Sequence, residues 1–405
     1  MWLIKLAWKN LWRNRSRTII TTSAVAFATL VSVLAKSLQE GVFDNLVKNI
    51  VSSYTGHIQV HLKGYFDEQV LDNSMPYNRQ LQQQVGKIEG VTAVAARLES
   101  FSLVSSGDKT KGCMVIGIMP QQENNITALG KKVKSGRYDA ADSGQVLIGE
   151  GLSTRLNADI GDTIILIGQG YHGSTAAGKY TVGGILHLGS PQLNDRLLVM
   201  NLSKAQELFS ADSMVTSFIV ALNERADLND VANTIHHAAG QQYEVMTWEQ
   251  IMPDIKQHIE TDTQNMNVIQ WILYVLVSFG IFSTLLIMMV ERRYETGMLV
   301  AIGMTKSRLQ LLVMLESLLT VVMGSVLGML ISFPIVSYLS RHPIRITGEM
   351  AKAYQRFGFE PIFPTSTDPM IFLGQGLIVF IIGLVLSLYP VYVVAKLDPV
   401  KAMRK

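Results

Sequence analysis

Four long apolar stretches constrain this chain more than any other feature of its sequence. Thr18–Ala35 and Thr263–Val290 contain no charged residue, and Leu309–Ser340 contains only one, Glu316. A fourth stretch lies within Pro369–Ala395. Each is long enough to cross a bilayer as a helix, which requires at least about 17 residues. The sequence therefore predicts a multi-pass α-helical membrane protein with four transmembrane helices.

The basic residues predict the orientation of these helices. Residues 1–17 carry five basic side chains and no acidic one, which places this end in the cytoplasm. Trp8 and Trp12 alternate there with basic residues at i, i+4 spacing, as in an amphipathic helix lying in the headgroups. A cleaved signal peptide ending at Ala35 is the alternative, but the basic segment is long for one. After four crossings the tail 396–405 returns to the cytoplasm, and its four basic residues agree.

The first two spans are separated by roughly 225 residues, enough for an independent core. Alternating Ile58, Val60 and Leu62 predict a strand, and similar strands follow a helical pattern, so this segment is predicted to be a large α+β extracytoplasmic domain. Residues from about 136 to 222 are predicted to form a β-rich insertion within it.

The prediction divides the chain into nine parts. The loop before the last span carries four basic residues, which runs mildly against the orientation rule, but the number of spans places it outside. In order, the parts are a cytoplasmic amphipathic elbow (1–17), transmembrane helix 1 (18–38), the periplasmic domain (39–267), transmembrane helix 2 (268–290), a cytoplasmic connector (291–308), transmembrane helix 3 (309–340), a periplasmic loop (341–368), transmembrane helix 4 (369–395) and a cytoplasmic tail (396–405).

The connector 291–308 has an ordered pattern of apolar residues, although a link between two membrane helices only has to be short and polar. Tyr294, Met298 and Ile302 recur every four residues, so a helix here would carry one apolar stripe. Gly303 is placed to end such a helix in a left-handed conformation. We therefore expect the connector to dock onto a protein in the cytoplasm. The residues expected to form this site are Glu291, Arg292, Arg293, Tyr294, Glu295, Gly297, Met298, Ile302 and Gly303.

The third apolar stretch contains two further candidate features. Glu316 follows Arg308 by eight residues, about 12 Å along a helix, where a carboxylate is unfavourable unless it faces protein or water. A packing or snorkelling position is one interpretation of Glu316, and relay of motion between helices is the other. Gly324 and Gly328 form a small-xxx-small pattern that allows a second helix to approach closely.

A glycine-rich loop lies within the predicted β-rich insertion. Gly168, Gly170 and Gly173 flank Tyr171 and His172. No helix is predicted after these glycines, so a phosphate cradle is not expected. The loop is interpreted as the tip of a long hairpin, and contact with a periplasmic partner is the functional alternative.

The sequence contains no recognisable catalytic motif. Gly178-Lys179 is followed by Tyr180 instead of Ser or Thr, so there is no P-loop, and the G-x-S-x-G and H-E-x-x-H patterns are absent. His57 and His61 lack a neighbouring Cys or carboxylate cluster, so no metal site is predicted. A net charge of +3 is too small to indicate nucleic-acid binding. We expect a chain without enzymatic activity, cofactor or metal of its own.

Several segments resemble one family. WKNLWRNRSRT near the N-terminus, ERRYETGMLVAIGM in the connector, Glu316 with the Gly324/Gly328 pattern, and AKLDPVKAMR at the end are similar to the permease subunits of MacB-type ABC transporters. GHIQVH and VLIGEGLSTRLNADIGDTIIL most resemble the lipoprotein-releasing branch, LolC and LolE. The resemblance covers essentially the whole chain.

This resemblance implies a dimer of permeases, homomeric or heteromeric, above two ATPase subunits in the bacterial inner membrane. The connector 291–308 would be the coupling helix seated in a separate LolD-like ATPase, which would bind the ATP and magnesium. ATP-driven movement at the cytoplasmic side would reshape the periplasmic domain. A lipoprotein or other amphiphilic substrate, and a periplasmic carrier or adaptor, would be the remaining partners.

Three functions are left open by this resemblance, besides a bare membrane-anchored binding domain, which would need no helix at 291–308. The first is extraction of lipoproteins from the inner membrane toward the outer membrane. The second is efflux or toxin export of the MacB kind with a periplasmic adaptor. The third is FtsX-like transmission of motion to an extracytoplasmic enzyme, which the large size of the external domain disfavours. No residue of that domain has chemistry specific to one substrate.

Overall fold

The chain divides into a helical unit and an α+β unit. A computed structural model describes residues 2–13, 15–50, 54–188, 190–223, 226–349, 351, 354 and 361–396, so the predicted tail lies outside it except for Lys396. The helical unit comprises Met1–Asp44, Ile259–Arg345 and Ile362–Lys405. The α+β unit comprises Asn45–His258 and Ile346–Pro361.

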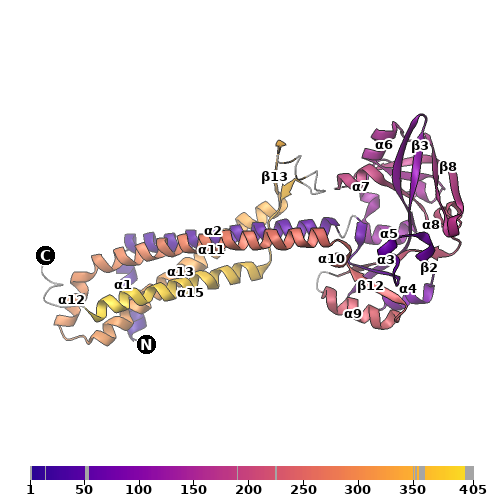
Figure 1. Ribbon diagram of the computed structural model, residues 1–405. Helices are drawn as coiled ribbons and strands as arrows, with labels where there is room; N and C mark the ends of the chain where they lie inside the picture. The colour runs from indigo at the N-terminus through magenta and orange to yellow at the C-terminus, as the bar shows by residue number, and fades with distance from the viewer. Residues whose placement is uncertain are drawn as a thin grey trace. The chain divides into compact units, whose positions relative to one another are not determined.

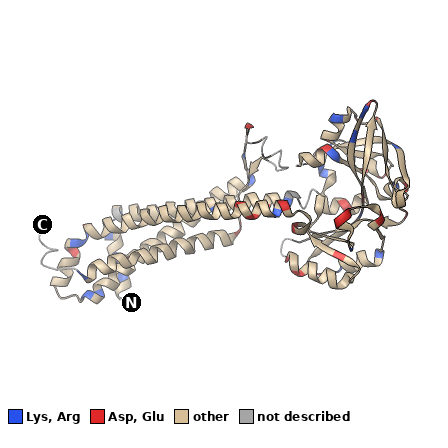
Figure 2. Cartoon of the chain, viewed as in Figure 1, with Lys and Arg blue, Asp and Glu red and all other residues tan. Residues whose placement is uncertain are grey.

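The helical unit is built from the apolar stretches. Figure 1 shows its long helices side by side, and Figure 2 shows that charged residues are sparse along them. Two short helices accompany them, α1 (Trp2–Arg13) and α12 (Arg293–Ala301). The four-helix membrane architecture is therefore confirmed. Within the described residues, the helices long and apolar enough to cross a membrane are α2 (Arg15–Ile50), α11 (Pro253–Glu291), α13 (Lys306–Arg341) and α15 (Pro369–Ala395).

Apolar residues lie both inside and outside this bundle. Val25 of α2, Ile281 of α11, Val321 of α13 and Val379 of α15 belong to one buried cluster. Trp271 of α11 is among the many large apolar side chains that are exposed on the outer surface. A helix that is apolar all round suits an environment of protein on one side and lipid on the other.

Two helices are much longer than the spans predicted at 18–38 and 268–290. α2 has 36 residues and α11 has 39, which corresponds to roughly 54 and 58 Å. The hydrocarbon core of a bilayer is only about 30 Å thick. The extra turns of α2 contain polar residues such as Lys36 and Glu40. Charge marks where the apolar part of α2 ends, but the helix itself continues through Gly41 to Ile50, where no proline interrupts it.

The α+β unit contains one large mixed sheet. It has ten strands, of which nine follow the order β12-β1-β11-β3-β4-β9-β6-β8-β5, while β7 pairs with both β3 and β8. The large α+β domain between the first two spanning helices is therefore confirmed. The strands are β1 (Ile58–Leu62), β3 (Val91–Ser106), β4 (Lys109–Ile118), β5 (Val133–Gly136), β6 (Val146–Gly149), β7 (Thr163–Gln169), β8 (Thr175–Leu186), β9 (Leu197–Asn201), β11 (Ser217–Leu222) and β12 (Tyr243–Thr247).

Short helices and two small ladders complete the described structure. β2 (Met75–Pro76) pairs with β10 (Met214–Val215), and β13 (Ile344–Arg345) pairs with β14 (Ile362–Phe363) in the helical unit. The helices of the α+β unit are α3 (Tyr65–Glu68), α4 (Arg79–Gly86), α5 (Pro120–Thr127), α6 (Glu150–Leu156), α7 (Pro191–Arg196), α8 (Leu202–Leu208), α9 (Leu228–Ala239) and α10 (Trp248–Ile251).

The long strand β3 connects the two parts of this sheet. Its first half pairs with β11 as far as Arg97, and its second half pairs with β7 from Ser102 onward. The strands between 136 and 222 are thus continuous with the rest of the sheet. The sequence assigns β11 to the insertion. In the structure β11 lies between β1 and β3, two strands that do not belong to the insertion. The order of strands depends on long-range pairing, which a local pattern does not reveal. The predicted end of the insertion at residue 222 therefore does not coincide with a division in the sheet.

A buried ion pair fastens β3 to α5. Arg97 and Glu123 are 2% and 0% exposed, and the guanidinium donates to both carboxylate oxygens, at 2.5 and 3.1 Å. Arg97 also donates to the main-chain oxygen of Tyr54 at 2.7 Å, and the Tyr54 hydroxyl donates to Glu99 at 2.7 Å. Burial alone would lower the pKa of Arg97, but Glu123 outweighs this effect and raises it. Tyr54, which follows α2 by four residues, is therefore hydrogen-bonded to β3 at the centre of the sheet.

Candidate functional site

Helix α12 exposes the apolar stripe that the sequence predicts. Tyr294, Met298 and Ile302 are 58%, 40% and 76% exposed, whereas Thr296 and Gly297 on the other face are buried. Figure 1 shows α12 at the end of the helical unit where α11 and α13 are connected. Exposed apolar groups in a short polar connector are typical of a surface that another protein covers. The helix is shorter than the connector 291–308.

A glycine ends α12 as expected. Gly303 has a φ of 106°, a left-handed value that L side chains rarely adopt. Its amide donates to the oxygen of Val300, and the Met304 amide donates to the oxygen of Leu299, both at 3.0 Å. These two bonds form a Schellman motif, which satisfies carbonyls at the helix end. The chain then enters α13 at Lys306. Because the helix ends at Gly303, Ile302 is the last residue of the exposed stripe.

A buried cluster, here called the Arg292 cluster, connects α12 to the bundle. Arg292 and Glu316 are 8% and 1% exposed and form an ion pair. Asn10 of α1 donates through Nδ2 to the Glu316 carboxylate at 2.7 Å, and its main-chain oxygen accepts from Arg292 at 3.2 Å. A charge in an apolar bundle requires such partners. The cluster therefore joins α1, the α11–α12 junction and α13.

A second contact joins α1 directly to α12. Arg13 and Glu295 form an ion pair at 2.5 Å, and their side chains are 59% and 45% exposed. An exposed pair contributes little stability, so its main effect is on orientation. Leu299 and Leu309 line a small cavity of 210 Å³ beside the Arg292 cluster. Movement of α12 would therefore displace α1 and α13 together.

The predicted connector residues separate into two groups. Arg292 and Gly297 are buried and belong to the packing beneath α12. Asn10 is a functional candidate that the sequence did not indicate, because one asparagine in an amphipathic segment has no distinguishing spacing. Glu295 is partly buried, and the exposed group consists of Glu291, Arg293, Tyr294, Met298, Ile302 and Gly303.

Two family models cover most of the chain. The MacB-like periplasmic core domain matches residues 18–238, which is more than half of it, and the FtsX-like permease C-terminal matches residues 267–399. The chain belongs to the MacB-like family of ABC transporter permeases. The predicted membership of this family is confirmed, and α12 lies within the FtsX-like part of the permease.

Two named relatives are similar to the permease over most of its length. LolC of Xylella fastidiosa, a lipoprotein-releasing system transmembrane protein, is 21% identical and matches 78% of each chain. The macrolide export ATP-binding/permease protein MacB of Acinetobacter baylyi is 22% identical and matches 97% of this chain and 58% of its own. Among solved structures, the periplasmic region of MacB from Actinobacillus actinomycetemcomitans matches 52% of the permease and 96% of its own chain, with 16% identity and a TM-score of 0.37.

The two glycines of α13 bring the first and third membrane helices of the permease together. A Cβ on Gly324 would lie 2.5 Å from Cβ of Val25, and one on Gly328 would lie 2.6 Å from the main-chain oxygen of Ala26. Real side chains do not approach so closely, so only glycine permits this packing. The small-residue pattern therefore seats α13 against α2, as small residues do between membrane helices.

Replacing Gly328 by alanine is expected to destabilise the permease by about 1–3 kcal/mol, because the new methyl group forces α13 away from α2. Gly280 of α11 is the matched control, since a Cβ there would have no neighbour within 4 Å. The measurement is thermal unfolding of both variants in the same detergent. Equal melting temperatures for Gly328→Ala and Gly280→Ala would show that the two helices do not pack at this glycine.

The glycine-rich loop is the tip of the β7–β8 hairpin, and this interpretation is confirmed. Gly168 lies in β7, while the loop folds back on its own domain. The Tyr171 amide donates to the oxygen of Phe209 at 2.8 Å, and the His172 amide donates to Asp72 at 2.7 Å. The His172 side chain is exposed. Contact with a periplasmic partner stays a prediction.

Proposed function

We propose that this permease transmits the work of ATP hydrolysis from a separate cytoplasmic ATPase to its periplasmic domain. The observation that carries the proposal is the exposed stripe of Tyr294, Met298 and Ile302 on α12. α12 lies between two membrane helices, and the Arg292 cluster joins it to α1 and α13. A partner that displaces α12 therefore displaces several helices at once.

The proposal includes an orientation and a set of partners. α12 and both chain ends would face the cytoplasm, in accord with the basic residues of 1–17. The ATPase would bind ATP and magnesium, since this chain carries no P-loop. A second permease copy or paralogue would complete the transporter. In the periplasm, Tyr54 follows α2 by four residues and accepts a hydrogen bond from Arg97 of β3, so it would carry movement of α2 into the sheet.

For the substrate, we propose lipoproteins extracted from the inner membrane toward the outer membrane. The support is the LolC relative, which is described as part of a lipoprotein-releasing system and matches 78% of this chain. The alternative is export with a periplasmic adaptor, because the MacB relative matches 97% of the chain. Depletion of the permease should leave lipoproteins in the inner membrane. A normal lipoprotein distribution would favour the export function instead.

Replacing Ile302 by aspartate is expected to reduce association with the ATPase at least tenfold, because it places a charge in an apolar contact. Co-purification and ATP hydrolysis of the complex are the measurements. The control is Ile160→Asp, which makes the same change at an exposed apolar residue of the α+β unit. If Ile302→Asp binds the ATPase as well as Ile160→Asp does, α12 is not the docking surface.

A further inference from the structure

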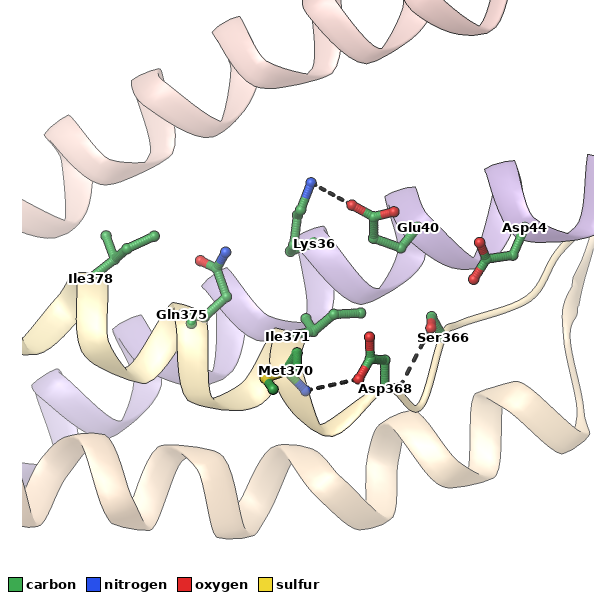
Figure 3. Close-up of a pocket in the computed structure, with 10 residues that line it drawn as sticks. Lys36, Glu40, Asp44, Ser366, Asp368, Met370, Ile371, Gln375 and Ile378 are labelled. Carbon is green, nitrogen blue, oxygen red and sulfur yellow. Dashed lines mark hydrogen bonds and ion pairs between the residues drawn. The ribbon is translucent and has the colours of Figure 1, made fainter. Parts of the chain in front are cut away.

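A pocket of about 420 Å³, lined by charged and apolar side chains, lies between α2 and the start of α15, within the helical unit. Lys36, Glu40 and Asp44 line it from α2, and Asp368 and Gln375 line it from the α15 side. Figure 3 shows these side chains on α2 and around the start of α15. The apolar stretch of α2 ends at Ala35, and α15 begins at Pro369. The pocket therefore lies where the apolar part of both helices gives way to polar residues, the level of lipid headgroups.

The charges in this pocket are unbalanced. Three carboxylates, Glu40, Asp44 and Asp368, face one cation, Lys36. Lys36 pairs with Glu40 at 2.7 Å, and Asp368 accepts a hydrogen bond from the Met370 amide at the start of α15. Two negative charges thus remain without a cationic partner among the lining residues. Such a site favours a cation over an anion.

A buried amide points to a second group on the ligand. Gln375 is only 5% exposed, and its Oε1 accepts hydrogen bonds from Ser32 at 2.6 Å and Tyr274 at 2.8 Å. These bonds fix the amide, yet its Nε2 donates to no residue that the structure describes. A donor held in place at the pocket wall is available to a hydrogen-bond acceptor inside the pocket. An oxygen of the ligand would satisfy it.

The two groups lie in a defined order. Lys36, Glu40 and Asp44 follow one another at four-residue intervals, about 6 Å apart along α2. The donors Lys36 and Gln375 are deeper in the apolar part of the unit, and Asp44 and Asp368 are nearer its polar end. A zwitterionic phospholipid has the same order, with its phosphate nearer the acyl chains and its ammonium group farther out. Ile371 and Ile378 line an apolar wall for the start of an acyl chain.

We propose that this pocket binds the headgroup of a phospholipid that carries a primary ammonium group. The phosphate contacts Lys36 and Gln375, and the ammonium group lies between Asp44 and Asp368. A primary ammonium group donates hydrogen bonds to these carboxylates, which a trimethylated one cannot do. This function is separate from the docking of α12, because none of the pocket residues contributes to that surface.

The test is lipid binding by the purified full-length permease. Phosphatidylethanolamine, its mono- and dimethylated forms, phosphatidylcholine and phosphatidylglycerol with identical acyl chains are titrated in detergent, and bound lipid is counted by native mass spectrometry. Phosphatidylethanolamine should bind about tenfold more tightly than phosphatidylcholine and phosphatidylglycerol, and affinity should fall with each methyl group. Equal affinity along the methylation series, or tighter binding of phosphatidylglycerol, would overturn the proposal.

Two variants locate the site. Asp44→Asn should lower affinity for phosphatidylethanolamine about tenfold and leave phosphatidylcholine unchanged, whereas Lys36→Gln should weaken binding of all the phospholipids. The control is Asp254→Asn, the same charge change at an exposed residue of α11 outside the pocket. An Asp44→Asn variant that still prefers the ethanolamine lipid overturns the assignment. Complete displacement of that lipid by magnesium chloride at constant ionic strength would also overturn it, in favour of a metal ion.

Discussion

Replacing Glu316 by glutamine is expected to lower the free energy of unfolding of the permease by about 3–5 kcal/mol. The reason is that Arg292, which is also buried, would lose its counter-ion while its charge remains inside the bundle. Asn10 would keep one hydrogen bond to the new amide but cannot neutralise the guanidinium. Equilibrium unfolding in detergent, followed by circular dichroism, measures the loss.

Two further variants test whether this loss of stability comes from the buried charge. Glu295→Gln breaks the exposed pair with Arg13, and we expect a change of only about 0–1 kcal/mol. The double variant Arg292→Met, Glu316→Leu removes both buried charges and should recover most of the lost stability. If Glu316→Gln were as stable as Glu295→Gln, the Arg292 cluster would not be a buried ion pair in the membrane.

The double variant also separates stability from coupling. It restores an apolar interior but has no ion pair between the α11–α12 junction and α13. We therefore expect the ATPase to bind α12 and hydrolyse ATP while substrate release falls. Normal release by this variant would show that Glu316 is a packing residue and does not relay motion.

Replacing Arg97 by methionine is expected to destabilise the α+β unit by a similar amount, about 3–5 kcal/mol. Glu123 is fully buried and would keep only the Thr127 hydroxyl, at 3.0 Å from its Oε1, in place of the two bonds from the guanidinium. The main-chain oxygen of Tyr54 would lose a donor as well. Hydrogen exchange of peptides from β3 and α5 in the full-length permease measures the effect where it arises.

The matched control is Arg155→Met, which removes the same side chain from an ion pair with Asp195 near the surface. We expect hydrogen exchange in β3 and α5 to be unchanged in this variant, because an ion pair near the surface contributes little. Protection of β3 that is equal in Arg97→Met and Arg155→Met would contradict the role of the buried pair. It would also weaken the connection proposed between the end of α2 and the sheet.

The membrane architecture and the α12 stripe could be predicted because each depends on a short stretch of sequence. A segment such as Thr18–Ala35 meets the condition for crossing a bilayer through its own length and lack of charge. The spacing of Tyr294, Met298 and Ile302 defines one face of a helix whatever surrounds it. Gly303 and the Gly324/Gly328 pattern were likewise recognisable, since only glycine permits the backbone geometry or the close approach found there.

Pairing between distant residues was decided only by the tertiary structure. The sequence indicates Arg292 and Glu316 as candidates, but it gives no sign of Asn10, which is 306 positions from Glu316. The position of β11 between β1 and β3 and the meeting of Asp44 with Asp368 at one pocket depend on the same kind of long-range contact. Local composition determines which segments are helical and where they cross the membrane. The partners of buried charges depend on how those segments pack, which no short stretch of sequence contains.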